Sequence, residues 1–168
     1  MVSSESELCS QSFWWLFVTC IGQLLTLTRW AGEEEGLLGS DHYVYSLSKE
    51  ENLKIRLFMD YDMMASPNFA YQIYNATNAV NPAGSEELRD LYIDWYKDQG
   101  LNYSFIPFDG RSDYDGFIRN DIPGGGIATG AEGIKTKQEE KEFGGKAGDW
   151  YDPCKLIFPE QQEKTSVS

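Results

Sequence analysis

The chain has 168 residues, of which 41% are apolar and 14% are aromatic, and this is enough for one domain with a hydrophobic core. Its 27 acidic residues outnumber 14 basic ones and give a formal net charge of -13. Nucleic-acid backbones and anionic membranes would repel such a chain, so we expect neither as a partner. A metal cation or an amine-bearing substrate fits this charge better.

Cysteine spacing and targeting signals leave the compartment open. Cys9, Cys20 and Cys154 lack any C-x-x-C spacing, so a structural zinc site of that type is not expected, and their pairing is undetermined. The apolar residues 13–27 match a signal-peptide core in length, but acidic residues precede them and no small-residue cleavage site follows. Asn75 and Asn102 begin N-x-S/T triplets, which would be glycosylation acceptors in a secreted protein.

The first third of the chain predicts a strand, two helices and a second strand. An apolar strand is predicted around residues 17–28, directly before the acidic run at residues 33–35. A helix follows the acidic turn, because apolar residues then recur at near-helical spacing. Ser48 opens a short second helix with a capping-box sequence. The β-rich residues 55–61 predict a buried strand, so Asp62 is expected at its end.

The middle of the chain predicts a strand and the longest helix. Residues 70–74 have the composition of a strand. Ser85 is expected to cap a helix that Gly100 ends. Five residues are predicted to form the apolar face of this helix: Leu88, Leu91, Tyr92, Trp95 and Tyr96.

A strand at residues 103–107, a short helix at 113–120 and a strand at 122–127 complete the pattern. The glycine run at residues 124–126 lacks the Lys-Ser/Thr of a phosphate-binding loop, and therefore predicts tight backbone packing. Alternating strands and helices predict an α/β sheet with helices on its faces.

Carboxylates at the ends of two predicted strands form the candidate site. In open α/β sheets, sites lie beyond the carboxyl ends of the strands, where Glu33, Glu34 and Asp62 are expected. Such groups can bind a metal and act as a general base near a bound water. The alternative is that the acidic run is a solvated helix N-terminus, where the helix dipole favours negative charge. Spacing alone favours this alternative.

Four sequence blocks change that balance. They are WAGEEEGLLGSDHYV (residues 30–44), MDYDMMASPN (59–68), FDGRSDYDGFIRNDIPGGGIATGAEGIKTK (108–137) and FGGKAGDWYDPC (143–154). They resemble, in order, successive blocks of the secreted two-zinc aminopeptidases of the aminopeptidase-Y and fungal leucine-aminopeptidase group. The resemblance implies a three-layer α/β/α sandwich with an incomplete sheet. It also implies secretion and peptide or protein substrates with a free N-terminus.

The resemblance assigns roles to five residues. Glu33 matches the family's general base, Glu34 a ligand of one zinc and Asp62 a ligand of the other. Met63 falls where the family lines the pocket for the substrate's first side chain, and Arg111 falls on an arginine near the substrate. Outside their motifs, Arg111 would be interpreted as a surface or ion-paired arginine and Met63 as a core residue.

The chain departs from the family in its zinc ligands. The family's zinc ions share a bridging Asp, and each also takes one His, from an upstream His-x-Asp motif and a downstream Tyr-His pair. Neither motif is present, and the single histidine, His42, is expected on a helix surface. One carboxylate per ion is too few for tight zinc binding. Ala128 stands where the family tends to carry an aromatic pocket residue, and Glu35 is expected to be a bystander.

These predictions divide the chain into a divergent segment at residues 1–28, a partial zinc aminopeptidase-like domain at 29–154 and a disordered tail at 155–168. The expected function is that of a zinc-dependent aminopeptidase, with activity in the complete protein and none in this chain alone. A gene-model fragment, a shortened isoform and a degenerate relative all remain open. The alternative function is a non-catalytic acidic module that binds peptide amino termini. The sequence does not predict an oligomeric state.

Overall fold

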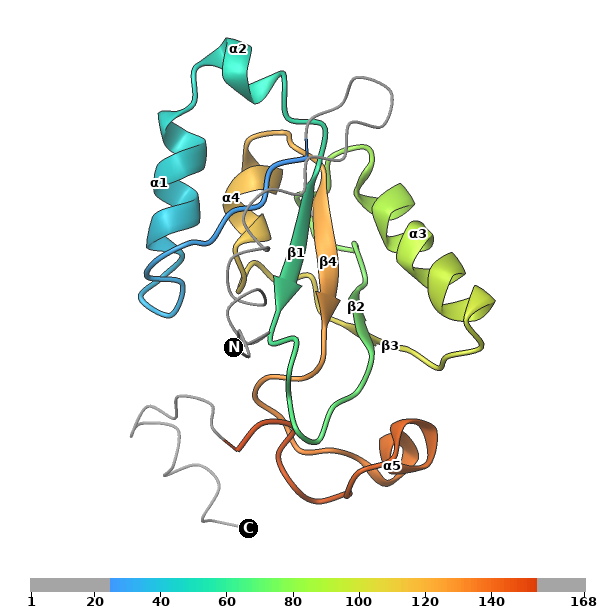
Figure 1. Cartoon of the computed structure of the whole chain (residues 1–168). Helices are drawn as coiled ribbons and strands as arrows, with labels where there is room; N and C mark the ends of the chain where they lie inside the picture. Colours follow the sequence, from blue (N-terminus) through green and yellow to red (C-terminus); the bar gives the residue numbers. More distant parts are fainter. Residues whose placement is uncertain (1–24, 154–168) are drawn as a thin grey trace, which may run out of the picture.

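The computed structural model describes residues 25–153 of the chain (Figure 1). The predictions for the N-terminal segment, the C-terminal tail and the three cysteines fall on or largely on residues outside this range. In chain order the elements are α1 (Leu38–Ser46), α2 (Lys49–Asn52), β1 (Phe58–Asp62), β2 (Gln72–Tyr74), α3 (Ser85–Asp98), β3 (Ser104–Ile106), α4 (Tyr114–Arg119), β4 (Gly124–Ala128) and α5 (Lys137–Phe143).

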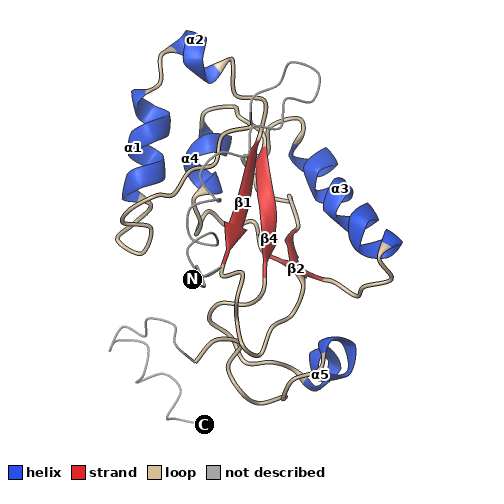
Figure 2. Cartoon of the chain, viewed as in Figure 1, coloured by secondary structure: helices blue, strands red, loops and turns tan. Residues whose placement is uncertain are grey.

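The strands form a mixed sheet in the order β1-β4-β2-β3. β1 is parallel to β4, β4 is antiparallel to β2, and β2 is parallel to β3. α3 packs on one face of the sheet, while α4 packs on the other face with α1 against it (Figures 1 and 2). The α/β prediction, with helices on both faces of an open sheet, is therefore confirmed.

The α3 side of the sheet carries one hydrophobic cluster, made by Leu88, Tyr92 and Tyr96 of the helix and Ile73 of β2. These helix residues are spaced by four, so they form one narrow stripe. The prediction of a wider apolar face was wrong, because Leu91 is 60% exposed and Trp95 is 54% exposed. Both lie beside the stripe and away from the sheet.

Aromatic stacking attaches α4 to the other face of the sheet. Phe58 of β1 stacks on Phe117 of α4 with ring centroids 4.0 Å apart. Tyr114 begins the same helix and stacks on Phe108 at 4.2 Å. Tyr114 is fully buried, so α4 is held tightly over the strands that end at the candidate site.

Glycine allows β1 and β4 to approach closely. A Cβ atom on Gly126 would lie 1.9 Å from the backbone oxygen of Asp60, a distance that no side chain tolerates. A Cβ atom on the neighbouring Gly125 would meet Leu88 at 3.5 Å, which is an ordinary contact. The prediction of tight backbone packing at the glycine run is therefore confirmed, and Gly126 carries the constraint.

Two helix caps can be compared with the predictions. Ser48 and Glu51 form the predicted capping box at α2. Ser85 was wrongly predicted as a cap, because Gly84 occupies the N-cap position and Ser85 is the first helical residue. The hydroxyl of Ser85 instead accepts a hydrogen bond from the backbone N–H of Gly124 at 3.1 Å, and so joins α3 to the start of β4.

The strand predicted around residues 17–28 can be judged only in its last part. Residues 25–28 form no strand, and Leu25 and Leu27 are exposed. The acidic run therefore does not follow a strand. It lies in a turn, in which the N–H groups of Gly36 and Leu37 donate to the carbonyl oxygen of Glu33 at 3.0 and 2.9 Å.

A segment not predicted to contain a helix follows β4 and includes α5. Lys135, 2% exposed, anchors it by donating from Nζ to the backbone oxygens of Phe69 and Gly144, both at 2.6 Å. The amide of Asn68 donates to the backbone oxygens of Lys146 and Trp150 at 3.0 and 3.2 Å. The sequence blocks at residues 59–68 and 143–154 are therefore in direct contact. Within residues 25–153, no helix has the length and apolar character needed to cross a bilayer.

Candidate functional site

Two carboxylates of β1 lie at the centre of the candidate site. Asp60 and Asp62 are two residues apart on one strand, so their side chains share the face covered by α4. The hydroxyl of Ser112 lies 2.7 Å from Oδ2 of Asp60 and 3.1 Å from Oδ2 of Asp62. The N–H of Tyr114 also donates to Oδ2 of Asp60 at 3.3 Å. The start of α4 therefore fixes both carboxylates in place.

Glu33 belongs to the same cluster, although it comes from the turn before α1. Its pKa is raised from 4.5 to about 7, first by burial and then by the negative charges of Asp62, Glu34, Asp113 and Asp60. Charges act on one another in this way only at short range in a partly buried site. The structure thus brings together Glu33 and Asp62, as the sequence predicted.

The rest of the cluster was not predicted. Burial raises the pKa of Asp60 to about 6, against the opposing effect of the Ser112 hydrogen bond. Burial also raises the pKa of Asp113, which accepts a hydrogen bond from the hydroxyl of Ser40 at 2.5 Å. An alternation of two along β1 would have indicated Asp60. Ser112 and Asp113 follow Arg111 directly in the sequence block that drew attention to that arginine.

The backbone turns sharply at Met63, just after β1. Met63 has a φ of 47°, a left-handed conformation that is uncommon for a residue with a side chain. Its carbonyl oxygen accepts a hydrogen bond from the N–H of Thr129 at 3.0 Å and a second one from the hydroxyl of Thr129. Strain of this kind persists where surrounding contacts hold it, and it is frequent at functional sites.

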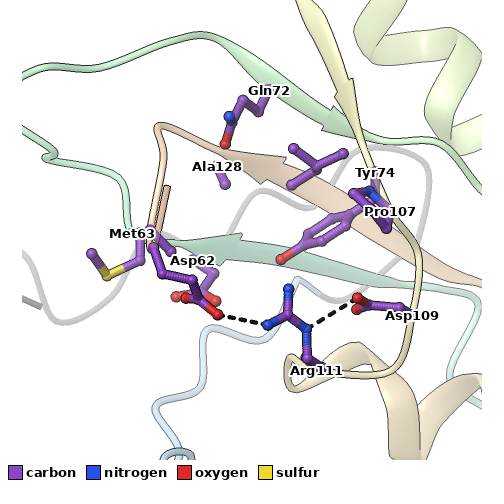
Figure 3. A pocket seen from close by; sticks show the side chains of 11 residues that line it. Asp62, Met63, Gln72, Tyr74, Pro107, Asp109, Arg111 and Ala128 are labelled. Carbon is purple, nitrogen blue, oxygen red and sulfur yellow. Dashed lines mark hydrogen bonds and ion pairs between the residues drawn. The ribbon is translucent and has the colours of Figure 1, made fainter. Parts of the chain in front are cut away.

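A cavity of about 190 Å³ opens beside Asp62 (Figure 3). Its walls come from the ends of β1, β2, β3 and β4, from the loop before α4 and from the loop after β4. The lining residues are Asp62, Met63, Gln72, Tyr74, Ile106, Pro107, Asp109, Arg111, Ala128, Ala131 and Glu132. Three predicted site residues, Asp62, Met63 and Arg111, thus line one cavity. Glu33 and Glu34 are not among its lining residues.

Arg111 lines this cavity, and its side chain is largely exposed. Its guanidinium makes ion pairs with Asp109 at 3.0 Å and Glu132 at 2.6 Å (Figure 3). Glu34 is exposed, and so is His42 on the surface of α1, as predicted. Gln72, Tyr74, Asp109 and Glu132 were missed as lining residues, since each reaches the cavity only through the pairing of distant segments.

The donor set does not fit a pair of zinc ions. Among residues 25–153, no group of three or more His, Cys, Asp and Glu side chains is arranged to hold a metal ion. The clustered groups are carboxylates, whereas zinc sites in proteins usually combine three or four ligands rich in imidazole or thiolate. The observed chemistry is therefore that of an anionic cluster with a near-neutral proton acceptor beside a small cavity.

Comparisons with known proteins place the chain in a family. Over 103 residues it is 71% identical to aminopeptidase Y of Saccharomyces cerevisiae, which covers 61% of this chain and 19% of the relative. Over 127 residues it is 49% identical to leucine aminopeptidase 2 of Trichophyton equinum, which covers 73% of this chain and 26% of the relative. The chain thus spans about a fifth to a quarter of the length of these curated relatives.

An aminopeptidase from Aneurinibacillus sp. strain AM-1 is similar in structure, with a TM-score of 0.42 and 26% sequence identity over 60% of this chain and 23% of that one. At this TM-score the likeness carries no weight of its own. The model of peptidase family M28 matches residues 22–154, which is most of the chain. The chain therefore belongs to peptidase family M28.

Proposed function

We propose that the chain forms part of a metallo-aminopeptidase, a hydrolase that removes N-terminal residues from peptides. The observation that carries the proposal is the position of Glu33, whose pKa is about 7, among carboxylates that include Asp62. Asp62 also borders the cavity with Met63 and Arg111. Relatives named aminopeptidase Y and leucine aminopeptidase 2 support the same activity.

Glu33 is proposed as the general base. A carboxyl group with a pKa near 7 is both available as a base and able to return a proton at neutral pH. It would take a proton from the water that attacks the first peptide carbonyl. Glu34 and Asp62 are proposed as metal ligands, one for each of two zinc ions. Met63 and Arg111 would contact the first residue of the bound peptide.

The charge of the cluster explains selection for a free amino end. Burial and the neighbouring negative charges, including that of Asp62, raise the pKa values of Glu33, Asp60 and Asp113, so a nearby cation would stabilise the ionised cluster. The α-ammonium group of a peptide supplies one positive charge beside the first peptide bond. An acetylated peptide lacks this charge and should bind more weakly.

Zinc is expected from the family resemblance, but the described residues do not make a zinc pair by themselves. We therefore assign no catalytic step to zinc in this chain. The purified chain with added zinc should hydrolyse leucine p-nitroanilide no faster than zinc alone. A zinc-dependent rate that Glu33→Gln abolishes would show that this chain is itself an enzyme. It would contradict our conclusion that the described residues supply too few ligands for a zinc pair.

The flanking nucleotide sequence tests the larger proposal. An in-frame His-x-Asp motif upstream and a Tyr-His pair downstream would supply the ligands that these residues lack. The longer product should then hydrolyse the anilide, and Glu33→Gln should lower its rate by about 10²- to 10⁴-fold, the usual loss for a general base. The exposed Glu35→Gln is the matched control. Equal activity of both variants would refute the role of Glu33.

A non-catalytic module that binds peptide amino termini is the second candidate. The lack of a zinc ligand set among residues 25–153 favours this candidate. The carboxylate cluster and the cavity are present without such a set. Calorimetry with leucinamide and N-acetyl-leucinamide would test it. We expect binding of the free amine only, and equal binding or no binding would remove this candidate.

We further propose secretion and N-glycosylation of the protein. Asn102 is exposed, and Asn75 is partly exposed with its Oδ1 accepting hydrogen bonds from the N–H and hydroxyl of Thr77 at 3.1 and 2.8 Å. Expression through a eukaryotic secretory pathway should yield a product whose mass falls after treatment with an N-glycosidase. Substitution of both asparagines by glutamine should abolish that change. An unchanged mass in the wild type would contradict glycosylation.

A further inference from the structure

One polar side chain of the cavity lacks a partner within the described part of the chain. Gln72 is only 7% exposed, lines the cavity from β2 and makes no side-chain hydrogen bond to any residue in the range 25–153. A primary amide offers two donors and an oxygen acceptor. Buried polar groups in native proteins are nearly always hydrogen-bonded. An unpaired amide that borders a cavity is therefore available to a ligand.

The other polar groups of the cavity are already occupied. Asp62 accepts from Ser112, and Asp109 and Glu132 are ion-paired with Arg111. The phenol of Tyr74 interacts with the hydroxyl of Ser112. The remaining lining residues are apolar: Met63, Ile106, Pro107, Ala128 and Ala131. The amide of Gln72 is thus the polar group left over for recognition.

The sheet register aims this amide at the site. Asp62 of β1 pairs with Ala128 of β4, and Ala128 pairs with Gln72 of β2, so the three side chains form one row on one face of the sheet. The small side chain of Ala128 lies between the other two. Figure 3 shows the amide of Gln72 above Ala128, with Asp62 on the opposite side of the cavity. A larger residue at position 128 would cover the amide.

We infer that Gln72 is a specificity-determining residue, whose amide hydrogen-bonds a polar, uncharged side chain on the first residue of the bound peptide. The inference rests on the proposed function, because it takes this cavity as the place of that residue. The amide of Gln72 is itself uncharged, and its two donors and one acceptor match those of another neutral polar group. An aliphatic side chain of the same size would strip the amide of water without replacing the lost hydrogen bonds.

A competing explanation involves the neighbouring strand. Ser104 of β3 is in register with Gln72, and its hydroxyl is buried without a hydrogen-bond partner among residues 25–153. Rotation of the amide toward Ser104 would satisfy both groups inside the protein. In that case Gln72 would act on stability alone, and its replacement would leave ligand preference unchanged.

Asparaginamide and leucinamide separate the two explanations, because their side chains have nearly the same shape and differ in polarity. Binding of each to the purified chain would be measured by NMR titration. The wild type should bind asparaginamide about five- to tenfold more tightly, the ratio expected for one hydrogen bond between neutral groups. Gln72→Met should reverse the preference, and Gln99→Met, at an exposed glutamine, should leave it unchanged.

Ala128→Leu provides a second test that leaves Gln72 intact. Its larger side chain should cover the amide and abolish the preference while leucinamide still binds. Preference for leucinamide in the wild type, or an unchanged preference in Gln72→Met, would overturn the inference and leave the proposed function standing. Failure of the wild type to bind either amide would remove both. Loss of stability in Gln72→Met with unchanged preference would favour the pairing with Ser104.

Discussion

Replacing Glu33 by glutamine should stabilise the folded protein at neutral and alkaline pH. The carboxyl of Glu33 has a pKa of 4.5 when solvated and about 7 in the folded chain. Between these values the folded state holds a proton that the unfolded state has released. Stability contributed by this group therefore falls as the pH rises from about 4.5 to about 7, and is constant outside that window.

The size of the effect follows from the two pKa values. A rise from 4.5 to about 7 corresponds to at most about 3 kcal/mol of destabilisation once Glu33 is ionised. Glu33 is only half-buried, so screening by solvent should reduce this to about 1–2 kcal/mol. The amide of glutamine keeps the shape of the side chain and removes its charge. It should recover most of that energy at pH 8 and little at pH 4.5.

Urea unfolding at several pH values between 4.5 and 8 would measure the effect. EDTA would keep metals away from the carboxylates. The stability gain of Glu33→Gln over wild type should rise by about 1–2 kcal/mol across this range, and 0.5 M salt should reduce the part due to neighbouring charges. Glu35→Gln, at an exposed position in the same turn, is the control. If the stability of the two variants relative to wild type rises equally with pH, Glu33 does not lie in a cluster of mutually repelling carboxylates.

Two further predictions concern packing. Gly126→Ala places a Cβ atom 1.9 Å from the backbone oxygen of Asp60 and should cost more than about 2 kcal/mol in thermal unfolding, whereas Gly125→Ala should change stability by less than about 1 kcal/mol. Similar effects of the two would contradict the close approach of β1 and β4. Lys135→Met leaves two backbone carbonyls without their donor and should cost about 2–4 kcal/mol in urea unfolding. The exposed Lys137→Met is its control, and an equally small loss in both would mean that Lys135 is no anchor.

Local signals predicted most of the helices and the positions of the strands. The capping box of Ser48 and the spacing of Leu88, Tyr92 and Tyr96 are short-range patterns, so α2 and α3 could be recognised without tertiary information. The same kind of signal was overlooked at α5, where Thr136 and Glu139 form a second capping box. Nothing local could reveal that Ser85 contacts β4, because that contact depends on how α3 lies on the sheet.

The strand predicted before the acidic turn was wrong in the part that can be judged, residues 25–28. The composition of this segment predicted a strand, but composition cannot supply a partner. Residues 25–30 pair with no strand in the described part of the chain, and Leu27 is 72% exposed. A strand forms where its main chain finds a neighbour, and in this sheet β1 is hydrogen-bonded to β4 alone among the described elements.

Only some of the charged residues of the candidate site were predicted, and the residues that hold them in place were not. Glu33 and Asp62 converge as expected, because the motifs around them could be recognised. Ser112 and Gln72 could not be assigned, since one is placed by the start of α4 and the other by pairing across β4. The sequence motifs thus identified two of the clustered carboxylates, while the fold determines what each of them contacts.

The position of β4 also sets the order in which this chain can fold. β4 comes last among the strands in sequence but lies between β1 and β2 in the sheet. Phe58 pairs with Gly124, so a loop of 65 intervening residues (59 to 123) must close before the ladder between β1 and β4 can form. The entropic cost of closing so large a loop must be met before these contacts form, and this slows folding. On the ribosome β1 cannot pair with β4 until Gly124 to Ala128 have emerged, so until then the edge of β1 that faces β4 is open to association with other chains.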